Sequence, residues 1–146
     1  MKTEDRKMKE IILLIMIVFL SACQENKHQR PDYQAFIDAE NLQQKDRIQQ
    51  FRFQGWQPLD DRHLILKSSQ RRIYLVRLMS SCIELPFAQS IKLKQDFDTT
   101  LNAKFDSIIV PGQFRQECSI DRIYELSKEQ KQALLDFSNQ PEEIRD

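Results

Sequence analysis

Glycine and net charge are both scarce in this chain of 146 residues. A phosphate-binding loop of the Walker or dinucleotide type needs several closely spaced glycines, and this chain has two, Gly55 and Gly112. We therefore expect no nucleotide ligand bound by such a loop. The 22 basic and 22 acidic residues cancel, and a near-neutral surface exerts no long-range attraction on nucleic acid. We expect no nucleic-acid partner.

Metal-ligating and catalytic residues are also sparse. The only histidines are His28 and His63, and the three cysteines form no Cys-x-x-Cys pair. No serine stands in a Gly-x-Ser-x-Gly turn, and the carboxylates show no spacing typical of a catalytic pair. We predict no metal, no cofactor and no enzymatic activity.

One apolar run stands out near the start of the chain. Residues 11–20 are ten consecutive apolar side chains, which as a helix would extend about 15 Å, half the thickness of a bilayer's hydrocarbon core. This length is typical of the apolar core of a signal peptide rather than of a membrane-spanning helix. The run predicts export.

The residues after this run carry a second signal. Leu20-Ser21-Ala22-Cys23 resembles the lipobox of bacterial lipoproteins. The resemblance implies that residues 1–22 are removed and that Cys23 receives lipid, which anchors the chain to a membrane of the cell envelope. Gln24, rather than Asp, favours the outer membrane, facing the periplasm. The alternative is an ordinary buried cysteine.

Cysteine usage fits this interpretation. If Cys23 carries lipid, Cys82 and Cys118 remain, and in an oxidising compartment a disulfide is their expected state. Closing that loop would stabilise the fold by roughly 3–4 kcal/mol in the chain-entropy model. Free or redox-active thiols and a metal site are the alternatives.

Removal of residues 1–22 would leave a nearly neutral mature chain of three parts. Residues 1–22 hold four of the basic and three of the acidic residues, which leaves 18 basic and 19 acidic residues after the cut. The predicted parts are a lipidated polar tether over 23–32, a single globular domain over 33–140 and a tail over 141–146.

An α+β fold is expected for the domain, with an antiparallel sheet of about five to six strands between an N-terminal and a C-terminal helix. Spaced apolar residues predict a helix over 31–50, with a break near Asn41. Ser127 and Gln130 form a capping-box pattern at the start of the last helix, which Pro141 ends. The strand segments are 63–67 with 73–78 as a hairpin, 87–93 (or a short helix), 105–110 and 118–126.

Several short landmarks occur in a distinctive order. They are Trp56-x-x-Leu59-Asp60-Asp61-Arg62-His63-Leu64, Tyr74-Leu75, Cys82-x-x-x-Pro86-Phe87-Ala88, Phe105-Asp106 and Cys118-x-Ile120-x-x-Ile123. Together they resemble a domain-of-unknown-function family of small exported bacterial proteins, number six-four-nine-one, over about 48–126. The resemblance implies the disulfide and a single domain, and no activity.

One polar cluster is a candidate contact site. Asp60, Asp61, Arg62 and His63 are consecutive, and Trp56 lies just before them. Pro58 favours a turn in which an Asp caps backbone amides, whereas a ligand or partner contact and acid–base catalysis are the functional alternatives.

Two functions follow as hypotheses. The first is a non-enzymatic lipoprotein that acts as a structural or partner-binding module for an envelope protein. The second is a small-ligand binder or weak hydrolase that uses Asp60, Asp61 and His63 near Trp56.

Overall fold

The computed structural model describes residues 30–112 and 114–140. Two helices and nine strand segments follow one another in these residues. In chain order they are α2 (Tyr33–Ala39), β1 (Gln44–Lys45), β2 (Arg47–Gln49), β3 (Gly55–Pro58), β4 (His63–Lys67), β5 (Ile73–Leu78), β6 (Lys92–Lys94), β7 (Thr100–Asn102), β8 (Ser107–Val110), β9 (Gln116–Leu126) and α3 (Lys128–Asn139). A 3₁₀ turn, η1 (Leu85–Phe87), lies between β5 and β6.

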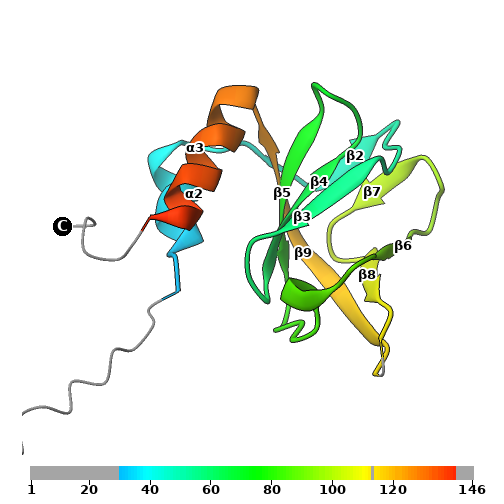
Figure 1. Cartoon of the computed structure of the whole chain (residues 1–146). Helices are drawn as coiled ribbons and strands as arrows, with labels where there is room; N and C mark the ends of the chain where they lie inside the picture. Colours follow the sequence, from blue (N-terminus) through cyan, green and yellow to red (C-terminus); the bar gives the residue numbers. More distant parts are fainter. Residues whose placement is uncertain (1–29, 113, 141–146) are drawn as a thin grey trace, which may run out of the picture. The chain divides into compact units, whose positions relative to one another are not determined.

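A curled antiparallel sheet forms most of the fold. Six strands follow one another across it in the order β3-β4-β5-β9-β8-β6, and β1 adds to the edge of β9. Strands β2 and β7 pair separately. Both helices lie on the same side of the sheet (Figure 1). The expected α+β class, with helices before and after an antiparallel sheet and one disulfide, is confirmed.

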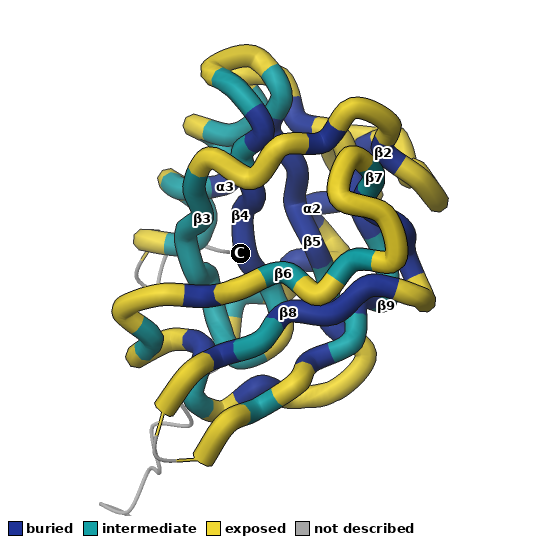
Figure 2. Tube along the Cα trace, turned by 90° about the vertical axis from the view of Figure 1, so that its right-hand side faces the viewer, coloured by how far each residue is buried: buried dark blue, intermediate teal, exposed yellow. Residues whose placement is uncertain are grey.

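The predicted hairpin is confirmed with its bounds unchanged. Strands β4 and β5 pair from His63 opposite Arg77 to Lys67 opposite Ile73. Both strands are buried on both faces, because they lie in the middle of the sheet between two apolar layers (Figure 2). Side chains alternate between these layers along each strand.

Two apolar cores result from this alternation. The first lies inside the curl of the sheet and includes Leu64, Leu66 and Val76. The second lies between the sheet and the helices. Its buried members are Tyr33, Phe36, Ile37, Leu42, Ile65, Ile73, Leu75, Tyr124, Leu126 and Leu134.

Strand β9 contributes to both cores, and a bulge within it lets two residues three apart, Ile120 and Ile123, face the same core. Arg77 of β5 is opposite Arg122, but the next residue, Leu78, is opposite Ile120, which leaves Asp121 as the extra residue. A bulge of this kind shifts the alternation of side chains by one position. Consequently Ile120 and then Ile123 face the inner core.

The disulfide lies in the inner core and joins the loop after β5 to the start of β9. Cys82 and Cys118 are bonded, with 6.0 Å between their Cα atoms, and both are buried. The bond fixes the loop after β5 against β9. The predicted pairing of these two cysteines is confirmed.

Asp106 has a structural role in the loop before β8. Its side chain is fully buried, and it accepts hydrogen bonds from the backbone N–H groups of Asn102 (2.6 Å) and Asp96 (3.1 Å). Satisfied in this way, a buried carboxylate stabilises a loop instead of destabilising the core. Asp106, one half of the Phe105-Asp106 landmark, therefore has a structural explanation.

The helix predicted over 31–50 is wrong in its second half. Helix α2 ends at Ala39, and Asn41 adopts a left-handed conformation with φ of 48°, which stops a helix. The predicted break at Asn41 is therefore confirmed. The residues beyond it form β1 and β2, because edge pairing with β9 and β7 satisfies their backbone groups.

Two other predicted segments lie close to the elements that the structure forms. The segment 87–93, predicted as a strand or a short helix, divides into the end of η1 and the start of β6. The capping box of α3 is confirmed, since Ser127 accepts from the N–H of Gln130 and the Gln130 side chain accepts from the N–H of Ser127.

Candidate functional site

A pocket opens where the start of α2 meets the start of β4, the end of β5 and the middle of β9. Its volume is about 390 Å³. The lining residues are Pro31, Asp32, Tyr33, Gln34, Arg62, His63, Arg77, Leu78, Met79 and Asp121. Two of the five residues predicted as a contact site, Arg62 and His63, therefore line a real cavity.

Asp60 builds the turn that leads into this pocket. One of its carboxylate oxygens accepts from the backbone N–H groups of Arg62 (2.7 Å) and His63 (2.6 Å), as expected for an Asp that caps a turn. Both carboxylate oxygens also lie 3.0 Å from Nδ1 of His63. The turn interpretation is confirmed, and the same carboxylate orients the imidazole.

His63 is held from two sides. Its ring centre lies 4.7 Å from that of Tyr33 on α2, and its side chain is 15% exposed. With Nδ1 bound to Asp60, only Nε2 remains for a ligand. Within the described ranges, no side chain or backbone group bonds to Nε2, and the guanidinium of exposed Arg62 also has no partner there. The pocket thus offers two polar groups that have no partner in that part of the chain.

An ion-pair network forms the opposite wall. Arg77 donates to Oδ2 of Asp121 through Nε (2.9 Å) and Nη2 (2.5 Å), and through Nη1 to Gln34 at 3.2 Å. Lys104 donates to the other oxygen of Asp121. The β-bulge places Asp121 here, because it turns this residue out of the ladder.

This network controls the ionisation of Asp121. Burial of the carboxyl raises its pKa, but the hydrogen bonds from Lys104 and Arg77 and the charges of both residues outweigh burial. The pKa of Asp121 is therefore lowered from its ordinary value of 3.8. Asp121 is ionised at neutral pH and holds Arg77 in place.

Stability should depend on pH through this group. A carboxyl whose pKa falls on folding stabilises the fold above its unfolded pKa, and this contribution is lost as pH falls through the folded pKa. We expect Asp121→Asn to lower the free energy of unfolding by about 2 kcal/mol at pH 7, and by less below pH 3.8. Urea unfolding of the wild type and the variant at pH 7 and at pH 2 measures the two free-energy differences.

The control is Asp136→Asn on the exposed side of α3. This variant should match the wild type at both pH values. An Asp121→Asn effect of the same size at pH 7 and at pH 2 would contradict the proposed role of the ionised carboxylate.

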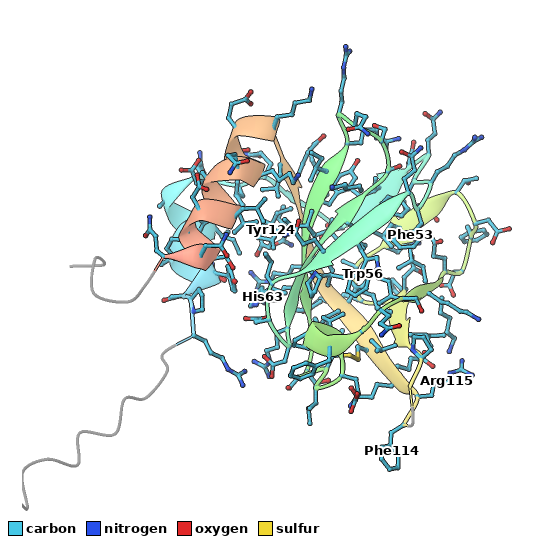
Figure 3. All side chains as sticks on the ribbon, viewed as in Figure 1. Phe53, Trp56, His63, Phe114, Arg115 and Tyr124 are labelled. Carbon is cyan, nitrogen blue, oxygen red and sulfur yellow. A yellow bond between two sulfur atoms is a disulfide. The ribbon has the colours of Figure 1, made fainter. Side chains whose placement is uncertain are left out.

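The remaining predicted site residues do not meet in this pocket. Asp61 accepts a hydrogen bond from Ser81 of the loop before Cys82. Trp56 lies opposite Leu66 and packs on the inner core, whereas His63 faces the helices (Figure 3). The predicted grouping of Asp60, Asp61 and His63 with Trp56 is wrong for Trp56, because strand alternation sends the two rings to opposite faces.

Sequence reasoning missed the other eight lining residues, among them Tyr33, Gln34, Arg77 and Asp121. One signal was present: the predicted hairpin, in its correct register, places Arg77 opposite His63. No sequence signal marked Asp121, since its position depends on the bulge.

The chemistry of the pocket favours binding. None of its lining residues is a serine, threonine or cysteine. The guanidinium of Arg62 and Nε2 of His63 suit an anionic or hydrogen-bond-accepting group, because the lining carboxylate of Asp121 is bonded to Arg77 and Lys104 and that of Asp32 accepts from backbone N–H groups of α2. In residues 30–112 and 114–140, no three His, Cys, Asp or Glu side chains gather in a way that could hold a metal. No helix in that part is long and apolar enough to cross a membrane.

Comparison with known proteins identifies the family. The model of a family of unknown function, DUF6491, matches residues 6–140. The chain belongs to this family. The match extends beyond the landmarks at both ends, so that it includes Cys23 and α3, which the shorter resemblance had left out. No curated protein and no solved structure matches the chain significantly.

Proposed function

We propose that this DUF6491 member is a lipoprotein, anchored through Cys23 to the outer membrane and facing the periplasm, whose domain is a non-catalytic binding module. Cysteine pairing is the observation that carries the proposal. Cys82 and Cys118 form a disulfide, which is typical of oxidising compartments. The one cysteine left over follows a signal-like apolar run and two small residues.

The anchor lies in a part of the chain with no described structure. The apolar run and Cys23 fall within residues 1–29, outside the described residues. Both fall within the family match over 6–140, which supports an N-terminal segment common to the family. Two or three acyl chains hold a protein on a membrane stably, whereas one alone does not.

The pocket supports the binding part of the proposal. Arg62 and His63 present donors without a partner in the described residues, and the ion pairs around Asp121 keep the opposite wall in one arrangement. Preorganised polar groups in a concave site are typical of binding sites. We propose an envelope component with an exposed carboxylate or phosphate as the bound partner.

Crosslinking in native membranes tests this binding role. We expect Arg62→Glu to abolish most of the crosslinked product that the wild type gives, because the new carboxylate would repel an anionic group at the mouth of the pocket. Arg71→Glu is the matched control. Arg71 is also exposed, but it lies in the β4–β5 turn at the other end of the sheet.

Mass spectrometry of the crosslinked products gives the outcome. Loss of the product with Arg62→Glu but not with Arg71→Glu supports the pocket as the binding site. Equal yields from both variants, or only monomer from the wild type under several crosslinking chemistries, would contradict it.

A further inference from the structure

Apolar side chains gather at one end of the sheet. The described residues include seven large apolar side chains that are exposed, and four of them, Met79, Ile83, Phe87 and Phe114, lie in η1 or in loops at this end. Phe114, Ile83 and Phe87 are 72%, 65% and 80% exposed. Exposed aromatic and aliphatic side chains gathered in this way are typical of an interaction surface.

Strand register shows that these loops share an end. Leu78 at the end of β5 pairs with Ile120 of β9, so Met79 lies beside the first half of β9. The backbone N–H of Glu84 bonds to the side chain of Gln116, which joins the loop of Ile83 and Phe87 to the start of β9. Phe114 lies just before that start, at the tip of the β8–β9 hairpin (Figure 3).

The tether enters the domain at the same end. Pro31, its last residue but one, lines the same pocket as Met79. Only seven residues separate Cys23 from Pro31, and they cover at most about 28 Å when fully extended. A lipid on Cys23 would therefore keep this end, rather than the opposite one, close to the bilayer.

Charge at this end also suits a lipid surface. A hollow of about 300 Å³ beside Phe114 is lined by Lys92, Ile109, Pro111, Gly112 and Arg115, with no acidic residue. The side chains of Lys92 and Arg115 make no hydrogen bond or ion pair within the described ranges, although the charge of Arg115 helps to lower the pKa of nearby Glu117. Cations next to exposed aromatic side chains match lipid phosphates above acyl chains.

We propose that this end, with Ile83, Phe87 and Phe114 inserted and with Lys92 and Arg115 against lipid phosphates, rests on the surface of the phospholipid bilayer. The proposal rests on the lipid anchor proposed above. Phe114 and its neighbours would enter the boundary between headgroups and acyl chains. The pocket with His63 would then face components at the membrane surface.

Quenching by brominated lipid tests this docking. The lipidated mature chain, from Cys23 to Asp146, is reconstituted in protein-free vesicles of phosphatidylglycerol and brominated phosphatidylcholine, with Phe114→Trp as the reporter. At a depth of about 5–10 Å the new indole would lie near the bromine atoms, so we expect its emission to fall by roughly half. The wild type, with Trp56 alone, gives the baseline to subtract.

Phe97→Trp is the matched control. Phe97 is similarly exposed, at 68%, but it follows β6 at Lys94, which pairs with Ser107 at the end of β8 away from the hairpin tip. Quenching at 114 without quenching at 97 supports the proposal. Equal emission changes at the two positions overturn it.

Flotation of the vesicles in a density gradient distinguishes failure of the docking from failure of the lipid anchor. If the chain floats with the vesicles and Trp at position 114 is not quenched, docking is wrong while the anchor stands, and the apolar end is then a surface for a protein partner. If the chain does not float, both the anchor and the docking are wrong.

Discussion

A chain in which serine replaces Cys23 is expected to take up no labelled palmitate and to keep residues 1–22. Transfer of a diacylglycerol requires a thiolate nucleophile, and a serine hydroxyl has almost no anionic form at neutral pH. Because a lipoprotein signal peptidase acts on the lipidated precursor, cleavage should fail together with lipidation. The expected loss of label is complete. Labelling of growing cells followed by immunoprecipitation measures it.

The control for this variant removes the other two cysteines. A chain with Cys82→Ala and Cys118→Ala keeps Leu20-Ser21-Ala22-Cys23, so it should be labelled and cut like the wild type. Normal cleavage of the Cys23→Ser chain, or palmitate on it, would refute the lipobox interpretation.

The same double replacement should have the largest effect on stability. The disulfide joins positions separated by 36 residues, and a closed loop of that size stabilises the folded state by about 4 kcal/mol in the chain-entropy model. Small domains are stable by only about 5–15 kcal/mol. We expect the double variant to unfold at much lower urea concentration than the wild type.

Alanine is chosen because both positions are buried and alanine leaves no unpaired polar group there. Treating the wild type with reductant should produce the same shift without any mutation. If both thiols react freely with an alkylating reagent in denatured, unreduced protein, the disulfide does not form in the cell and this prediction fails.

Local chemistry accounts for the parts of the fold that the sequence predicted. The β4–β5 hairpin was predictable because two apolar runs flank the polar turn residues 68–72. Helix α3 was predictable because Ser127 and Gln130 cap each other within four residues of chain. Signals of this kind are complete within one short segment.

Tertiary contacts account for the parts that were missed. Residues 44–49 resemble a helix in spacing, but pairing with β9 and β7 makes them strands. Nothing local marks Gln50, whose left-handed backbone is held by hydrogen bonds from Arg72 to the carbonyls of Gln49 and Gln50. The secondary-structure propensity of about ten residues is a weaker determinant than strand pairing and hydrogen bonds of this kind.

In the candidate site, too, the sequence predicted the local contacts but not the tertiary ones. The turn formed by Asp60 and its approach to His63 follow from three residues of sequence. The opposite wall depends on a bulge that a sequence pattern does not mark, and it joins Gln34, Arg77 and Asp121 from three elements. Trp56 was misplaced because proximity in sequence does not determine which face of a sheet a side chain takes.

Peptide mass spectrometry of the purified membrane-bound protein tests the central claim most directly. If Cys23 is the anchor, trypsin releases a first peptide that runs from Cys23 to Lys27 and carries diacylglycerol on its sulfur, and no peptide from residues 1–22 is found. Detection of the continuous peptide from Glu10 to Lys27 with an unmodified Cys23 thiol as the main product would contradict the account.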